Sequence, residues 1–110
     1  MRLALALLAG ATFAQTPQAS LSGTIFDERG GPVIAARLEL RGDGSQLYRG
    51  KSSEQGTFRF GRMEPGVYTL AIDQAGFCKA EISSIKLKAS EQKTLQRFIL
   101  RTPDDKGDCR

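Results

Sequence analysis

The sequence predicts an all-β fold, an antiparallel Greek-key β-sandwich of about seven strands. Two observations predict it. Apolar and polar residues alternate with a period of two along short runs, and turn-forming residues recur about every 8–12 residues. Dense alternation also indicates that each sheet keeps one face in water and contributes the other to a shared core.

The clearest pattern, residues 53–72, reads as turn, strand, turn, strand. Gly56 marks the first turn, because glycine takes a positive φ without steric cost. The strand that follows, Thr57–Phe60, alternates polar and aromatic residues, so Phe58 and Phe60 share one face.

Pro65 and Gly66 form the second turn of this stretch, because proline fixes φ and glycine accepts the next position. The strand after it, Val67–Ile72, alternates again. We expect the two strands to form a hairpin. The turn also predicts a tyrosine corner, in which the Tyr68 hydroxyl bonds to the backbone a few residues upstream.

The remaining strands are predicted from the same alternation at 21–26, 37–41, 46–53, 80–87 and 94–100. Ile82 and Ile85 are three positions apart, which predicts a bulge near Ser83-Ser84. Leu95 is out of phase with the rest of the last strand, which predicts a bulge or an edge position there.

The N-terminus has the pattern of a secretory signal peptide over residues 1–14: one arginine, an apolar run, then small residues. Cleavage after Ala14 leaves a polar linker, 15–19, and predicts a secreted or periplasmic protein. The apolar run is shorter than the about 20 residues of a membrane span. The alternative is a buried N-terminal strand or helix.

Two cysteines, Cys78 and Cys109, predict one disulfide bridge in an oxidising compartment. The alternative is two free thiols. A metal site is disfavoured, because two thiolates without histidine leave the coordination incomplete. The polar C-terminal tail, 102–110, is expected to be poorly ordered apart from Cys109.

Composition argues against several classes of function. The 110 residues carry a net charge of +4, but basic and acidic residues are interspersed and there is no tryptophan, which disfavours nucleic-acid binding. The absence of histidine removes the usual nucleophile–base pairs. Neighbouring carboxylates at Asp27-Glu28 and Asp104-Asp105 are interpreted as solvated turn charges. We therefore expect no catalytic residue, cofactor or metal.

A set of short motifs resembles carboxypeptidase regulatory-like domains, in the order that this family has them. The motifs lie at residues 21–27, 31–33, 35–40, 56–60, 65–70 and 75–77, the last including Gly76. The resemblance implies a transthyretin/Ig-like, prealbumin-type β-sandwich over residues 20–101. It also implies an accessory module without catalytic residues. The cysteine pair is a departure from the family pattern.

The sequence therefore favours a secreted, non-catalytic interaction module that binds a protein partner, for example through an exposed strand edge. The alternative is a carbohydrate-binding domain, with Tyr48 as a candidate ligand contact. An enzyme is disfavoured. The tripeptide Arg41-Gly42-Asp43 matches an adhesion motif, but the end of a strand in a glycine-rich loop already accounts for it.

Overall fold

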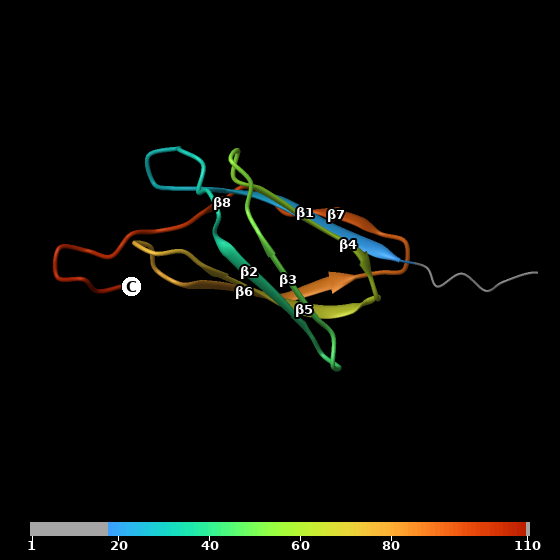
Figure 1. Ribbon diagram of the computed structural model, residues 1–110. Coiled ribbons are helices and arrows are strands. Elements are labelled where there is room, and N and C mark those ends of the chain that lie inside the picture. Colours follow the sequence, from blue (N-terminus) through green and yellow to red (C-terminus); the bar gives the residue numbers. More distant parts are fainter. Residues whose placement is uncertain (1–17, 110) are drawn as a thin grey trace, which may run out of the picture.

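The computed structural model describes residues 18–109, which form two facing β-sheets (Figure 1). The predicted signal peptide and most of the predicted linker lie outside the described residues. The all-β sandwich is confirmed. Its strands are β1 (Ala19–Phe26), β2 (Arg37–Gly42), β3 (Leu47–Lys51), β4 (Thr57–Met63), β5 (Gly66–Asp73), β6 (Ala80–Leu87), β7 (Gln92–Thr94) and β8 (Phe98–Ile99).

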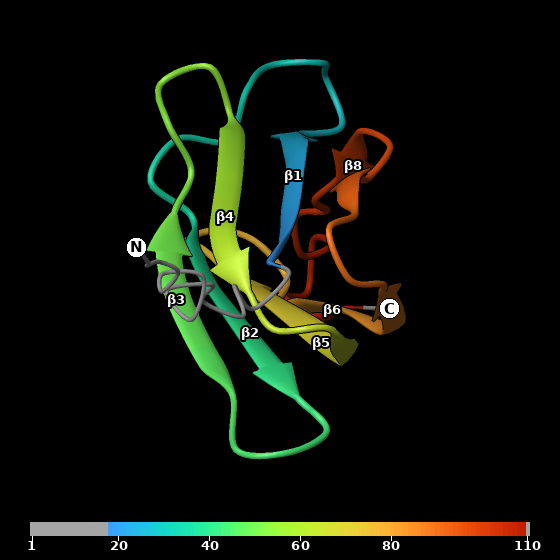
Figure 2. The same ribbon diagram turned by 90° about the vertical axis from the view of Figure 1, so that its right-hand side faces the viewer.

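The first sheet has the order β4-β1-β7, and β8 also pairs with β1. The second sheet has the order β3-β2-β5-β6, in which every neighbouring pair is antiparallel. Figure 2 shows β3 as the outermost strand on one side of the second sheet.

The prediction of one antiparallel strand over 94–100 is wrong. The segment contains β7 and β8, and both pair with β1 in parallel. Leu95 and Phe98 both pack against the core although they are three positions apart, which an unbroken strand does not permit. The chain therefore leaves the strand conformation at residues 95–97. Parallel pairing is open to this segment because the intervening strands of both sheets, and not a tight turn, connect it to β1.

The predicted hairpin of Thr57–Phe60 with Val67–Ile72 is also wrong. β4 pairs with β1, whereas β5 pairs with β2 and β6 in the other sheet. The connection through Pro65 therefore crosses between the sheets. The apolar faces of the two strands meet across the core instead of lying side by side on one sheet.

Inward-facing side chains of both sheets form one core. Its aromatic rings need space that glycines provide. A Cβ at position 23 would lie 2.7 Å from the ring of Phe58, and one at position 50 would lie 3.3 Å from the ring of Phe60. Phe58 is directly opposite Gly23 on the neighbouring strand, so the ring covers the glycine.

The predicted tyrosine corner is present where the chain crosses between the sheets. Tyr68 is only 1% exposed, and its hydroxyl donates to the Glu64 carbonyl at 2.5 Å. Burial, with the Tyr48 hydroxyl nearby, raises the pKa of Tyr68 above its usual range. The two tyrosine rings also pack together at a centroid distance of 6.0 Å.

The predicted bulge in β6 is confirmed. Tyr68 pairs with Ile85 and Leu70 with Ile82, so two residues of β6 lie opposite one residue of β5. Ser84 takes a φ of 60° there. A second bulge, which the sequence did not predict, lies in β4 at Arg62, where φ is 53°.

The C-terminal tail, expected to be poorly ordered, forms a hydrogen-bonded turn. Asp104 Oδ1 accepts hydrogen bonds from the backbone N–H groups of Lys106 and Asp108. The predicted disulfide joins Cys78 to Cys109 and closes the tail onto the segment before β6. Short polar side chains that bond to the local backbone explain the order of this segment.

Replacing Tyr68 with phenylalanine should lower the free energy of unfolding by about 1–2 kcal/mol, because the Glu64 carbonyl loses its donor. Denaturant unfolding measures this loss. The matched control is Tyr48→Phe, which removes an exposed hydrogen bond from the Glu64 N–H at 3.2 Å. The control should lose clearly less stability. Equal losses in the two variants would contradict a special role of the corner.

Gly56 and Gly76 both have a positive φ, of 77° and 86°, but their surroundings differ. A Cβ at position 56 would lie 2.5 Å from the Ile25 carbonyl oxygen, whereas nothing lies within 4 Å of a Cβ at position 76. We expect Gly76→Ala to lose about 1–2 kcal/mol of unfolding free energy from backbone strain alone. Gly56→Ala should lose about 2–4 kcal/mol, since the clash adds to the strain. Similar losses in denaturant unfolding would show that the close approach to β1 is absent.

Candidate interaction surface

A shallow trough of about 640 Å³ lies on the outer face of the second sheet. The trough is lined by outward side chains of all four strands, by Lys79 before β6, and by Leu38 and Gly50, which occupy inward-facing positions of β2 and β3. The lining residues are Arg37, Leu38, Glu39, Arg41, Arg49, Gly50, Lys51, Thr69, Ala71, Asp73, Lys79 and Glu81.

The trough exists because the outward residues of β5 are short. Thr69 and Ala71 form its floor, between the long outward side chains of β2 on one side and Glu81 on the other. Cross-strand neighbours on one face of a sheet stand about 5 Å apart, so a short residue between two long ones leaves a furrow.

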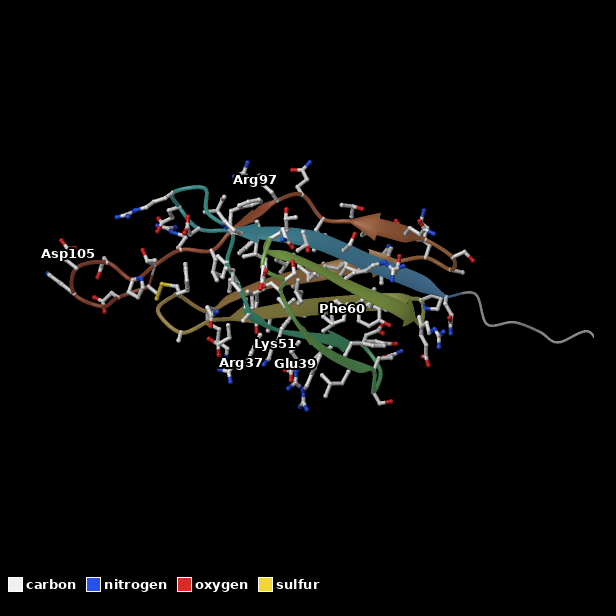
Figure 3. All side chains as sticks on the ribbon, turned by 45° about the horizontal axis from the view of Figure 1, so that its top comes forward. Arg37, Glu39, Lys51, Phe60, Arg97 and Asp105 are labelled. Atoms are coloured by element: carbon white, nitrogen blue, oxygen red, sulfur yellow. A yellow bond between two sulfur atoms is a disulfide. The ribbon has the colours of Figure 1, made fainter. Side chains whose placement is uncertain are left out.

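Charge is distributed unevenly along this face. Its β2 and β3 side carries four cations, Arg37, Arg41, Arg49 and Lys51, with Glu39 as the one acidic residue among them. We call these four cations the basic half-face. The side formed by β5 and β6 carries Asp73 and Glu81, with Lys79 beside them and Lys86 further along β6. Figure 3 shows Arg37, Glu39 and Lys51 on the same outer side, whereas Phe60 lies between the sheets.

Glu39 organises the arginines of the basic half-face. Its two carboxylate oxygens accept hydrogen bonds from Nε of Arg41 and Nε of Arg49, each at 3.1 Å. The Arg49 hydrogen bond is the main cause that holds the pKa of Glu39 below its usual range, so Glu39 is ionised at neutral pH. These pairs are solvent-exposed and contribute little to stability, but they fix where the guanidinium groups stand.

Arg37 and Lys51 are direct cross-strand partners on this face, a like-charged pair. Like charges directly opposite each other destabilise a sheet. Arg37 has a partner in Asp73 at 3.1 Å, whereas Lys51 makes no ion pair within residues 18–109. Lys51 therefore has no acidic partner among the described residues, which makes it a candidate contact for an anionic partner.

The residues that the sequence singled out as structural lie away from this surface, in the core and in turns. Phe58 and Phe60 are buried, Gly56 lies in the turn before β4, and Gly76 lies in the turn after β5. Pro65 and Gly66 lie in the crossing that leads to the corner.

Tyr48, the candidate ligand contact, is half-buried in the structure. Its ring packs on Tyr68, and its hydroxyl accepts a hydrogen bond from the Glu64 N–H. The Tyr48 side chain is therefore already engaged in contacts around the tyrosine corner.

The carboxylates of Asp27 and Glu28 accept hydrogen bonds from loop residues. Asp27 Oδ1 accepts from the N–H groups of Arg29 and Gly31. Glu28 accepts from both the backbone and the hydroxyl of Thr102, and the backbone bond is the main cause that lowers the pKa of Glu28. Residues 18–109 contain no group of three or more potential ligands that could hold a metal ion.

A second, smaller hollow of about 180 Å³ adjoins the disulfide, where Phe98, Lys79 and Arg101 contribute to its walls. Within the described part of the chain, no helix has the length and apolar character needed to cross a membrane.

Sequence reasoning missed the basic half-face, because interspersed charges were interpreted as ordinary solvated strand faces. Alternation did place Arg37 and Arg41 outward, but the strand register that aligns them with Arg49 and Lys51 is a tertiary property. Ser52 was missed too. It is buried, donates to the Val33 carbonyl at 2.6 Å and accepts from the Ala36 N–H at 2.8 Å.

Several solved structures share the fold. A structure from Bacteroides uniformis, described as a putative carbohydrate binding protein, superposes with a TM-score of 0.62 at 19% identity, over 76% of this chain and 41% of that one. An interface mutant of a type II cohesin–X-dockerin complex from Acetivibrio cellulolyticus gives a TM-score of 0.61 at 20% identity, over 78% and 59%. Hydroxyquinol 1,2-dioxygenase from Pseudomonas putida gives 0.57 at 13% identity, over 81% and 58%.

These likenesses show the fold alone, and in each case this chain matches less than two thirds of the longer protein. A search of curated protein sequences finds no match. The model of the carboxypeptidase regulatory-like domain matches residues 20–101, which include nearly all of β1 and every later strand. The chain therefore belongs to the carboxypeptidase regulatory-like domain family.

Proposed function

We propose that this chain is a secreted, non-catalytic module that binds a protein partner through the outer face of its second sheet. The basic half-face is the observation that carries this proposal. It gathers four cations on two neighbouring strands, and one of them, Lys51, opposes the like-charged Arg37. Arg and Lys so arranged suit the carboxylates of a protein surface, because a guanidinium fork donates two parallel hydrogen bonds to the two oxygens of a carboxylate.

An open, charged trough fits binding better than catalysis. The enzymes that share the fold do so at 11–13% identity, so they carry no activity over to this chain. The family model and the binding proteins among the structural neighbours support a binding role. The disulfide between Cys78 and Cys109 supports a location outside the cytosol, where such bridges persist.

Carbohydrate binding is the weaker alternative. Sugar-binding sites usually present an exposed aromatic ring on which the sugar stacks. Every aromatic ring within residues 18–109 is buried or half-buried, and the exposed large apolar residues there are aliphatic: Ile34, Leu47, Val67 and Ile99.

Capture from the secreted or periplasmic fraction of the source cells tests the proposed function. Three baits are compared by quantitative mass spectrometry: wild type, Arg49→Ser/Lys51→Ser, and Arg59→Ser as the control. Arg59 is exposed on β4 in the first sheet, so the control removes a cation from the opposite side. We expect one protein to be enriched on wild type and control, and lost at least fivefold from the double variant.

The proposed function is contradicted if no protein is enriched on the wild-type bait. If the wild-type protein is retained on cell-wall polysaccharide and captures no protein, carbohydrate binding would replace protein binding as the proposed function. In that case Tyr48→Ala should abolish the retention, since Tyr48 is the aromatic residue that the sequence offers for a sugar contact.

A further inference from the structure

We infer that the partner binds as an extended, acidic strand that pairs with the free edge of β3. This inference rests on the proposed function and names both the docking edge and the chemistry of the partner. Three features of the structure support it: the other sheet edges are interrupted, backbone groups of β3 point out of the sheet, and cations stand beside them.

The other edges of the sandwich are interrupted. β4 carries a bulge at Arg62 and β6 carries a bulge at Ser84, each with a positive φ. β7 and β8 are only three and two residues long. Bulges, very short strands and charged edge side chains are among the means by which proteins limit pairing at a sheet edge. β3 differs, because its five residues pair with β2 in an unbroken register.

The hydrogen bonds around the β2–β3 pair show which backbone groups of β3 are free. The Gly42 N–H donates to the Gln46 carbonyl at 2.9 Å, and the Ser52 N–H donates to the Ala36 carbonyl at 3.0 Å. Hydrogen-bonded pairs alternate with non-bonded pairs along an antiparallel ladder. The bonds at both ends of the pair fix the same alternation. The backbone N–H and C=O groups of three residues of β3 therefore point away from β2: Leu47, Arg49 and Lys51.

The backbone N–H and C=O groups of these three residues point out of the sheet edge, and within residues 18–109 no other backbone group bonds to them. Together they offer the hydrogen bonds that an added strand needs. Their side chains lie on the outer face, and Leu47 is 44% exposed.

Charge at this edge selects the added strand. Arg49 and Lys51 face outward two residues apart, so acidic residues at alternate positions of an antiparallel partner would stand opposite them. An apolar residue two positions further on would stand opposite Leu47. The same cations oppose pairing of β3 with a second copy of itself, because like charges would then meet. The edge is therefore closed to its own copies and open to an acidic strand.

A synthetic peptide with the repeat Glu-Thr-Glu-Thr-Val tests this directly, with Lys-Thr-Lys-Thr-Val as its control. Amide chemical-shift changes in NMR titrations locate the binding and give the affinity. We expect the acidic peptide to bind along β3 and the lysine peptide not to bind.

Two substitutions separate charge from backbone pairing. Lys51→Glu should weaken the acidic peptide about tenfold, since attraction becomes repulsion. This variant should keep its fold, because the new carboxylate faces Arg37. Arg59→Glu makes the same charge change on the first sheet and should bind like wild type.

Leu47→Pro removes one outward N–H and keeps both cations, and a proline is tolerated on an edge strand where its N–H faces away from the sheet. It should abolish peptide binding, whereas Leu47→Ala should not. A melting curve for each variant confirms that it is folded.

Binding of both peptides alike, or unchanged binding to Lys51→Glu and Leu47→Pro, would overturn the edge proposal. So would shift changes confined to β6 or to the first sheet. If the peptide experiment fails while protein capture succeeds, only the docking edge is wrong. If no protein is captured, the proposed function itself is wrong.

Discussion

The architecture depends on the crossing from β4 to β5, where the Tyr68 hydroxyl holds the Glu64 carbonyl four residues upstream. This hydrogen bond fixes the arch that carries the chain from one sheet to the other. Because the chain crosses here, Phe58 and Phe60 come from one layer and Tyr68 and Leu70 from the facing layer. Without the crossing, the two strands would form a hairpin and no core would close between the sheets.

The same crossing determines which surface is available for binding. It places β5 next to β2, so that short outward residues on β5 lie beside the long cations of β2 and create the trough. It also leaves β3 with a single neighbour, at the edge of the second sheet. The inner face of the sheet is committed to the core, where Gly50 makes room for the ring of Phe60. The outer face and the β3 edge remain for a partner.

Period-two alternation, the turn residues and the position of Tyr68 just after Pro65-Gly66 were enough to predict the sandwich, the tyrosine corner and the bulge at Ser83-Ser84. These patterns did not predict features that depend on contacts between segments distant in the sequence. The alternation of Val67–Ile72 is the same in a hairpin and in a crossing, so the sequence did not distinguish them. The basic half-face was missed for a related reason. Arg37 and Lys51 become neighbours only through the β2–β3 register, which the pattern of either strand alone does not specify.

Amide hydrogen exchange in the free protein, followed residue by residue by NMR, tests the central claim most directly. The account predicts an alternation along β3, because only every second N–H is bonded to β2. Tyr48 and Gly50 should exchange slowly, and Leu47, Arg49 and Lys51 should exchange fast. Slow exchange at Leu47, Arg49 and Lys51 would show that this edge is already covered, and it would contradict an open docking strand.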